Sequence, residues 1–389
     1  MKKKLIALAV AGAFVAPVAM ADTTIYGSAN VSLDFVNSGS NGGSATQVSS
    51  NASIVGLKGA EDMGSGTSAI WQIESDIGLS NSAGSPSTLA SRDSFAGLSG
   101  KDWGTLLLGR HDTPYKMATR GLDLFADTIA DNRALMGPLD GTDRIHVPDV
   151  VAYVSPAMAG VTVAAAYVAG AGTPVGSADQ TNGTTKGNAY SLAAMYGAGP
   201  INVSLAYQSL EIGSAGTGLL GNGQDVNNGG INGCELGCGL SPNDKFTSWK
   251  LGGGYSVDAF TINLAYESVK YQPNIATYGT KNQSDWYLAG KYNFSNSDAV
   301  KLAYTAAGDS SFQQAVYGDS SDSGAKQWAV GYDHSLSKNT MVYALYTQVS
   351  NDTYAAYGLG GFDGIGGNVS AAQLGNKVDA WSLGLKHSF

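Results

Sequence analysis

Every second residue is apolar in most extended segments of this 389-residue chain, and this alternation constrains the fold more than any other feature. In residues 201–207, Ile, Val, Leu and Tyr alternate with Asn, Ser and Ala, and residues 259–266 and 381–389 repeat the pattern. A period of two is typical of β-strands that have one apolar face and one polar or small face. The apolar faces must therefore pack against a second sheet or against lipid.

We expect sixteen such strands, at residues 23–36, 50–60, 66–77, 92–100, 104–110, 144–155, 160–170, 188–197, 201–212, 245–257, 259–271, 283–295, 298–308, 325–337, 339–350 and 377–389. The links between them alternate between short, as at 101–103, and long, as at 37–49, 111–143 and 213–244. This layout predicts an all-β fold, a 16-stranded antiparallel transmembrane β-barrel with short periplasmic turns and long extracellular loops. Side chains cannot fill a barrel of this width, so we expect a water-filled lumen.

The composition fits such a barrel and argues against other classes. Charged residues make up 14% of the chain, against about 25% in soluble proteins. After residue 21 no apolar run is long enough for a transmembrane helix, and a closed barrel is the other structure that satisfies every backbone group in lipid. The net charge of -9 argues against a nucleic-acid partner.

The first 21 residues have the features of a secretory signal peptide. Three lysines at residues 2–4 precede an apolar run over residues 5–21, which ends in Ala-Met-Ala. A charged head, an apolar middle and a small-residue end predict cleavage after Ala21. The alternative, a membrane anchor, would have barely enough residues to span a bilayer. We therefore divide the chain into a signal peptide at 1–21 and a β-barrel at 22–389.

Several motifs then point to a known family. They are GLKGAEDMGSG at 56–66, AIWQIE at 69–74, RDSFAGL at 92–98, GTLLLGR at 104–110, DTPYK at 112–116, VAYVSP at 151–156 and GLKHSF at 384–389. In this order they resemble Gram-negative outer-membrane general diffusion porins of the betaproteobacterial and neisserial type.

The resemblance implies a homotrimer in the outer membrane of a Gram-negative bacterium, in contact with lipid and lipopolysaccharide. Each barrel would pass ions and small hydrophilic solutes by passive diffusion, and the third long loop, 111–143, would fold inward as a constriction. The C-terminal strand looks like the signal that the outer-membrane assembly machinery reads. Its residues here are Trp381, Leu383, Leu385 and Phe389.

In the family, basic residues of the wall face acidic residues of the third loop across the narrowest part of the pore. Carried over, the basic wall comprises Arg92, Arg110, Arg144 and Lys58, and the acidic loop comprises Asp112, Asp123, Asp127 and Asp131. The family usually has another arginine where this chain has Ile54, and Lys58 shares that face. We therefore expect the pore to discriminate only weakly between cations and anions. The alternative for each residue is a solvated position in the lumen or at its mouth.

The acids of the loop are spaced by four, which predicts a short helical turn over residues 122–131 with the acids on one face. Leu124, Phe125 and Ile129 would hold this turn against the wall.

The remaining candidate residues give weaker signals. Cys234 and Cys238 lie in loop 213–244 without a second Cys pair or a nearby His, so we expect a local disulfide rather than a metal site. No cofactor is predicted, and the acid-rich loop 309–322 favours at most loosely bound surface Ca²⁺. No catalytic motif accompanies the four His, so we expect no enzyme; a Ser/His pair, as in an outer-membrane phospholipase, is the alternative.

Two other functions stay open beside the diffusion pore. One is a substrate-specific outer-membrane channel on the same barrel, which saturable block by a single solute would indicate. The other is a secreted or surface β adhesin without a pore.

Overall fold

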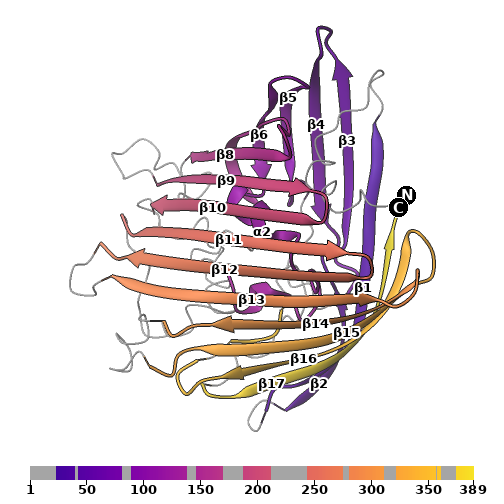
Figure 1. The fold of residues 1–389 in the computed structure, drawn as a ribbon, viewed down its shortest axis with the longest axis vertical. Helices are drawn as coiled ribbons and strands as arrows, with labels where there is room; N and C mark the ends of the chain where they lie inside the picture. Colours follow the sequence, from indigo (N-terminus) through magenta and orange to yellow (C-terminus); the bar gives the residue numbers. More distant parts are fainter. Residues whose placement is uncertain are drawn as a thin grey trace.

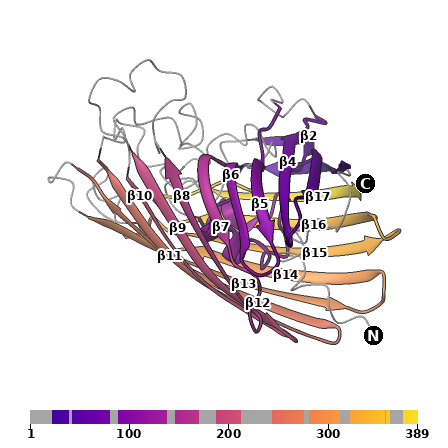
Figure 2. The same ribbon diagram turned by 90° about the horizontal axis from the view of Figure 1, so that it is seen from above.

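The computed structural model describes residues 23–39, 43–80, 89–137, 146–169, 187–211, 243–274, 280–310, 321–355, 357–360 and 374–389, and for Lys281 the backbone alone. Within these residues, seventeen strand segments form one antiparallel sheet that closes on itself (Figures 1 and 2). The segments are β1 Thr24–Asn37, β2 Ser44–Ser50, β3 Ile54–Asp62, β4 Thr67–Asp76, β5 Ser94–Gly100, β6 Gly104–His111, β7 Val147–Val154, β8 Val161–Ala169, β9 Asn188–Ala198, β10 Ile201–Glu211, β11 Lys245–Val257, β12 Phe260–Gln272, β13 Lys281–Asn293, β14 Asp298–Ala307, β15 Ala325–Ser335, β16 Thr340–Asn351 and β17 Lys377–Ser388.

The barrel has sixteen strand positions because β2 and β3 form one interrupted strand. Both segments pair with β1. Segment β2 pairs with residues 31–37 of β1, and β3 pairs with residues 24–28 of β1. From β3 onward each segment pairs with the next, and β17 pairs with β1 from Ser28 to Asn37 to close the sheet. The predicted 16-stranded antiparallel barrel is confirmed, and apart from the interrupted strand its bounds agree with the prediction to within three residues.

The prediction was wrong for the start of the second strand, which it placed at residue 50 after a loop at 37–49. The structure has β2 at Ser44–Ser50 and a break before β3. In the break, the Asn51 amide donates to the Asn30 carbonyl at 2.7 Å, the Ser53 hydroxyl accepts from the Asn30 amide at 3.0 Å, and Ala52 has φ 50°. Polar residues occupy both faces of β2, so no apolar alternation marks it.

The outward face of the sheet is apolar and exposed, with aliphatic residues such as Leu264 and Leu302 between two aromatic belts. Cross-strand rings contact one another in the first belt, Trp249–Tyr266 at 5.0 Å and Tyr346–Trp381 at 4.9 Å between centroids. The second belt lies nearer the short turns and includes Tyr153, Tyr196, Tyr255, Phe260, Tyr292 and Tyr332. Aromatic belts flanking an aliphatic band are typical of barrels in a bilayer. In the described part of the chain, no helix has the length and hydropathy to cross a membrane.

The C-terminal residue completes the seam of the barrel. Gly27 and Phe389 exchange two backbone hydrogen bonds, of 3.0 and 3.1 Å, and the Phe389 ring lies where a side chain at Gly27 would stand. Trp381, Leu383 and Leu385 point outward from β17 and are exposed. The residues predicted as an assembly signal thus share an accessible outer surface, while their role as a signal stays a prediction.

Some glycines of the sheet make room for an aromatic ring on the neighbouring strand. A Cβ atom added to these glycines would lie 2.0–2.6 Å from the ring, closer than any real contact. The cross-strand pairs are Gly384–Tyr343, Gly56–Tyr26 and Gly59–Trp71. Covering a strand glycine with an aromatic ring fixes register and restores packing that glycine lacks.

We predict that Gly384→Ala destabilises the barrel by about 1–3 kcal/mol, the usual cost of overpacking. The new methyl group would meet the Tyr343 ring and displace its hydroxyl from Asn51 Nδ2, which donates to it at 2.9 Å. Urea unfolding followed by tryptophan fluorescence measures the change. Gly253→Ala is the matched control, because the nearest atom to its Cβ lies 4.0 Å away. Equal midpoints for the two variants would contradict the prediction.

Candidate functional site

The segment that follows β6 enters the barrel interior and carries the predicted acidic residues. Its helix α2, Pro114–Arg120, begins where the Thr113 hydroxyl accepts from the Lys116 amide and Pro114 takes the first helical position, and it ends at Gly121. A 3₁₀ turn, η1, follows at Asn132–Ala134. Figure 1 shows α2 behind β10 and β11, enclosed by the barrel wall.

The predicted helical turn over residues 122–131 is wrong, because this stretch consists of turns. Asp127 has φ 58°, a left-handed conformation that interrupts any helix between Asp123 and Asp131. The helix forms earlier, at Pro114–Arg120, where a capping threonine and a proline give the start signal.

The inserted segment is anchored to many strands of the inner wall. Ser191 of β9 accepts from the Tyr115 amide at 2.9 Å, and the Asn263 side chain of β12 donates to the Leu122 carbonyl at 2.7 Å. On the opposite side, the Asn30 side chain of β1 donates to the Asp127 carbonyl at 3.1 Å. Hydrogen bonds from β9 around to β1 place the segment across the interior, as the resemblance implied.

Apolar side chains fasten the same segment, as the sequence predicted. Phe125 and Ile129 are buried among alanines and other side chains of the inner wall, and Leu124 packs against that cluster. A Cβ at Gly331 of β15 would lie 2.8 Å from the Phe125 ring, so the bare glycine lets the ring approach the sheet.

The three acids of the loop come together around arginines of the loop itself. Arg120 contacts Asp127, lies 3.0 Å from Asp131 Oδ2 and lies 3.6 Å from Asp123 Oδ2. Arg133 adds a 2.8 Å contact to Asp131. These three acids therefore pair with arginines of the loop itself. In the described structure, they do not pair with the predicted arginines of the wall.

Burial and these charges shift the pKa values of the loop groups in opposite directions. Burial, reinforced by the neighbouring Asp131, raises the pKa of Asp123 to about 6 although Arg120 opposes the shift. Burial also disfavours ionised Asp131, but the guanidinium groups of Arg120 and Arg133 outweigh it and hold the pKa of Asp131 well below its usual range. At neutral pH the cluster holds three carboxylates and two guanidinium groups, a net charge of about -1.

The three predicted basic wall residues that the structure describes, Lys58, Arg92 and Arg110, lie in two groups. Arg92 bridges Glu74 at 2.8 Å and Asp76 at 2.9 Å, and Lys58 stands 5.0 Å from the ring centroid of Tyr26, whose hydroxyl donates to Glu74. The charge of Arg92 is thus largely neutralised by carboxylates of β4. Glu74 was not among the predicted site residues, although its parity with Gln72 could have placed it on the inner face.

Arg110 belongs to the second group, at the base of the loop. Its guanidinium donates to the His146 carbonyl at 2.7 Å, just before β7. The predicted acid Asp112 lies at this base and not with the other three acids. Its carboxylate contacts Lys116 Nζ at 2.7 Å and His146 Nδ1 at 2.8 Å. Although burial opposes ionisation, Lys116 and His146 hold the pKa of Asp112 well below its usual range.

Two further ion pairs of the inner wall were not predicted from the sequence. Lys250 and Glu267 pair at 3.1 Å between β11 and β12, and Lys301 pairs with Asp333 at 3.0 Å between β14 and β15. Glu267 also accepts from the Gly137 amide at 3.0 Å, which fixes the described end of the loop. Of the other predicted residues, Arg144, Cys234, Cys238 and the signal peptide lie outside the described residues, as does most of loop 309–322.

Comparisons with known proteins give a consistent result. The profile described as "Gram-negative porin" matches residues 7–354. The chain is 25% identical to outer membrane porin protein 32 of Delftia acidovorans and 25% identical to the major outer membrane protein P.IA of Neisseria meningitidis serogroup B, over the full length of each pair. Its fold is similar to that of an anion-selective porin from Comamonas acidovorans, with a TM-score of 0.73 and 23% identity over 95% of this chain and all of that one.

We predict that the permeability of the channel to cations relative to anions, measured across a planar bilayer, falls between pH 7 and pH 5. The pKa of Asp123 is about 6, so its carboxylate is charged at pH 7 and protonated at pH 5, which takes the loop cluster from about -1 to about 0. Reversal potentials in a salt gradient measure the effect. The Asp123→Asn variant should not show this change in reversal potential between pH 7 and pH 5, whereas Asp127→Asn should still show it. A change of equal size in Asp123→Asn would show that the pH dependence does not arise from the Asp123 carboxylate.

We predict that Arg120→Met loosens the loop by about 3 kcal/mol, because it leaves Asp123 and Asp131 buried with reduced charge compensation. Limited proteolysis of the folded barrel should cut within residues 112–137 faster than in the unaltered protein. Lys270→Met, which also replaces a cationic side chain by methionine but at an exposed position of β12, should leave the cleavage rate unchanged. Equal rates for both variants would show that Arg120 does not hold the loop.

Proposed function

Because the chain belongs to the Gram-negative porin family, we propose that it is an outer-membrane diffusion channel whose passage is narrowed by residues 112–137. The family and the barrel establish a porin that passes ions and small hydrophilic solutes through the outer membrane. The proposal adds the residues that narrow and charge the passage. The proposal rests on the hydrogen bonds that attach this segment to opposite sides of the wall, at Ser191 of β9 and at Asn30 of β1.

Family and fold point to a channel rather than an enzyme, and we propose that the chain catalyses no reaction. Several of the charged groups described inside the barrel are paired with one another, as Arg92 is with Glu74 and Lys250 is with Glu267. Such pairing suits a fixed electrostatic surface. Passing solutes would feel this surface without forming a bond to it.

We propose that the charge preference of the channel is weak. Bases and acids nearly balance among the described residues of the loop and the adjacent wall. The bases are Lys58, Arg92, Arg110, Lys116, Arg120 and Arg133, and the acids are Glu74, Asp76, Asp93, Asp112, Asp123, Asp127 and Asp131. The porin from Comamonas acidovorans is described as anion-selective. Here Ile54 replaces one arginine of the family pattern, and the carboxylates of β4 neutralise Arg92, so we expect a smaller preference.

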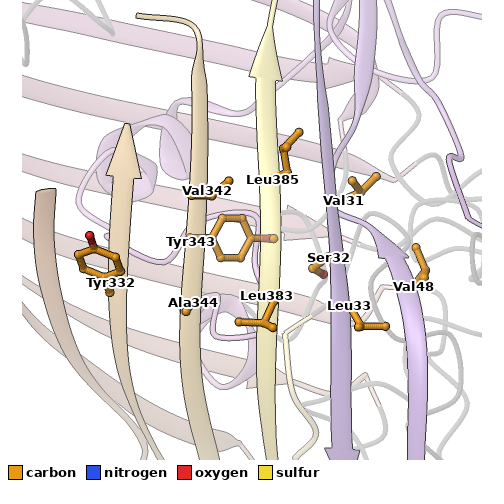
Figure 3. Close-up of a pocket in the computed structure, with 11 residues that line it drawn as sticks. Val31, Ser32, Leu33, Val48, Tyr332, Val342, Tyr343, Ala344, Leu383 and Leu385 are labelled. Atoms are coloured by element: carbon orange, nitrogen blue, oxygen red, sulfur yellow. The ribbon is translucent and has the colours of Figure 1, made fainter. Parts of the chain in front are cut away.

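We further propose that three copies associate through the outer face of β1, β2, β16 and β17. A depression of about 580 Å³ lies there, lined by aliphatic residues including Val31, Val342 and Leu383 (Figure 3). Ala344 also lines it, and small side chains allow a neighbouring barrel to approach closely. The remaining outer face would contact lipid and lipopolysaccharide, and the C-terminal strand would be read by the assembly machinery.

The test of the channel is single-channel conductance of the detergent-purified protein in a planar bilayer. We expect large steps that close in threes and a reversal potential near zero in a salt gradient. Saturable block by one solute would favour a substrate-specific channel on the same barrel. Absence of conductance from a folded preparation would overturn the open-channel proposal.

We predict that Arg110→Glu moves the ion preference toward cations. Reversing a charge about 8 Å from a passing ion changes the ion's energy in water by about 1 kcal/mol before screening, which is a few-fold in relative permeability. The reversal potential in a salt gradient measures this change. Lys338→Glu, the same reversal in a short turn at the barrel rim, should have little effect. An unchanged preference in Arg110→Glu would remove this residue from the ion pathway.

A further inference from the structure

Three chain segments meet at the base of the inserted loop and bring ligand-type side chains together. Asp93 precedes β5, Asp112 follows β6 and His146 precedes β7. His146 Nδ1 lies 2.7 Å from Asp93 Oδ1 and 2.8 Å from Asp112 Oδ1, and the three ligand atoms all lie within 4.8 Å of one another. We call these residues the loop-base cluster. We propose that the loop-base cluster binds a divalent transition-metal ion, with Zn²⁺ as the best match.

The two carboxylate oxygens near His146 Nδ1 are arranged as ligands of a shared metal ion would be, and one proton on Nδ1 serves them less well. Nδ1 of an imidazole carries either one hydrogen or one lone pair, yet two carboxylate oxygens from different segments approach it at hydrogen-bond distance. A shared metal ion would satisfy all three atoms at once. Zn²⁺ prefers imidazole nitrogen and carboxylate oxygen at about 2.0–2.2 Å, so the ligand atoms would need to separate by about 0.5 Å to admit it.

A second histidine lies beside the cluster and supplies another donor. His111 Nδ1 lies 2.8 Å from the Asp112 carbonyl, which can only accept, so Nδ1 carries the hydrogen. Its Nε2 lies 3.8 Å from Asp93 Oδ2, the second oxygen of the same carboxylate. Two of the four histidines of the chain thus meet two aspartates here.

The surroundings hold the ligands in place, as the outer contacts of metal sites do. His146 is 7% exposed, and its carbonyl accepts from Arg110 at 2.7 Å. The Asp112 backbone amide donates to Asp93 Oδ1 at 2.9 Å, which orients the Asp93 carboxylate against the backbone at Asp112. The Asp93 carboxylate and the backbone at His146 are therefore each held by a hydrogen bond.

Lys116 is the group that competes with the metal. Its ammonium lies 2.7 Å from Asp112 Oδ1 and would have to turn away when the ion binds. The charged and titratable groups that face His146 are Asp93, Asp112, Lys116, His111 and Arg110. Removal of the lysine charge should strengthen binding, whereas removal of the imidazole should abolish it. These opposite effects separate a metal site from a purely structural hydrogen-bond network.

The experiment is isothermal titration of the chelator-treated, detergent-purified full-length protein with ZnCl₂ at pH 7.5, with MgCl₂ as the comparison ion. We expect saturable Zn²⁺ binding that is at least about tenfold tighter than Mg²⁺ binding. His146→Ala should weaken Zn²⁺ binding at least about tenfold, and Lys116→Met should strengthen it a few-fold. His334→Ala is the matched control, because His334 lies 2.7 Å from a single carboxylate, that of Asp298, and should leave binding unchanged.

Folding of each variant is checked by the heat-dependent shift of its electrophoretic mobility, so a loss of binding in a folded His146→Ala protein supports the site. Equal binding in His146→Ala and the unaltered protein would overturn the proposal. So would weaker binding in Lys116→Met, or Zn²⁺ and Mg²⁺ binding of equal strength, which indicates unspecific attraction by the carboxylates. Should His146→Ala fail to fold, Lys116→Met and the ion comparison still decide the question.

Discussion

The antiparallel pairing of β17 with β1 is the contact on which the rest of this structure depends. Lipid offers no hydrogen bonds, so a sheet can cross a membrane only when its two edges satisfy each other. The register from Ser28 to Asn37 against the last strand does this, and Phe389 extends it by two backbone bonds to Gly27. Closure also fixes the width of the interior and therefore the distance that an inserted loop must cross.

Several charged side chains of the interior find their counter-charges on the same loop or on an adjacent strand. Arg92 is neutralised by carboxylates of the adjacent strand, and Arg120 gathers three acids of its own loop. Lys250 and Glu267 pair across neighbouring strands. In a confined space with restricted water, an unpaired charge is expensive, so local pairing is the arrangement that the physics favours.

The sequence was most informative where one short-range pattern determines the structure. Apolar alternation against lipid located the strands, and it failed only at Ser44–Ser50, where both faces are polar and the pairing with β1 alone makes a strand. The helix was misplaced because spacing by four cannot reveal that Asp127 adopts a left-handed conformation. Composition and motif order nevertheless gave the correct family and barrel.

Side-chain partners were the least predictable feature, because they depend on register and on loop paths. The pair of Arg92 with Glu74 joins residues 18 positions apart, and the contact of His146 with Asp93 spans 53 positions. Periodicity places such residues on a face of the sheet. It does not say which of them lie at the same height, so the predicted opposition of wall and loop charges could not anticipate their local pairing.

The self-contained ion pairs of the inserted loop have a consequence for how proteins of this kind diversify. Because Asp123, Asp127 and Asp131 find their counter-charges in Arg120 and Arg133, these three acids do not depend on the wall for electrostatic balance. The charges of this cluster are therefore separable from those of the wall, although hydrogen bonds still join loop and wall. Wall charges that do not contact the loop can change without compensating substitutions in the cluster, so the charge seen by a permeating ion can drift while the barrel around it stays the same.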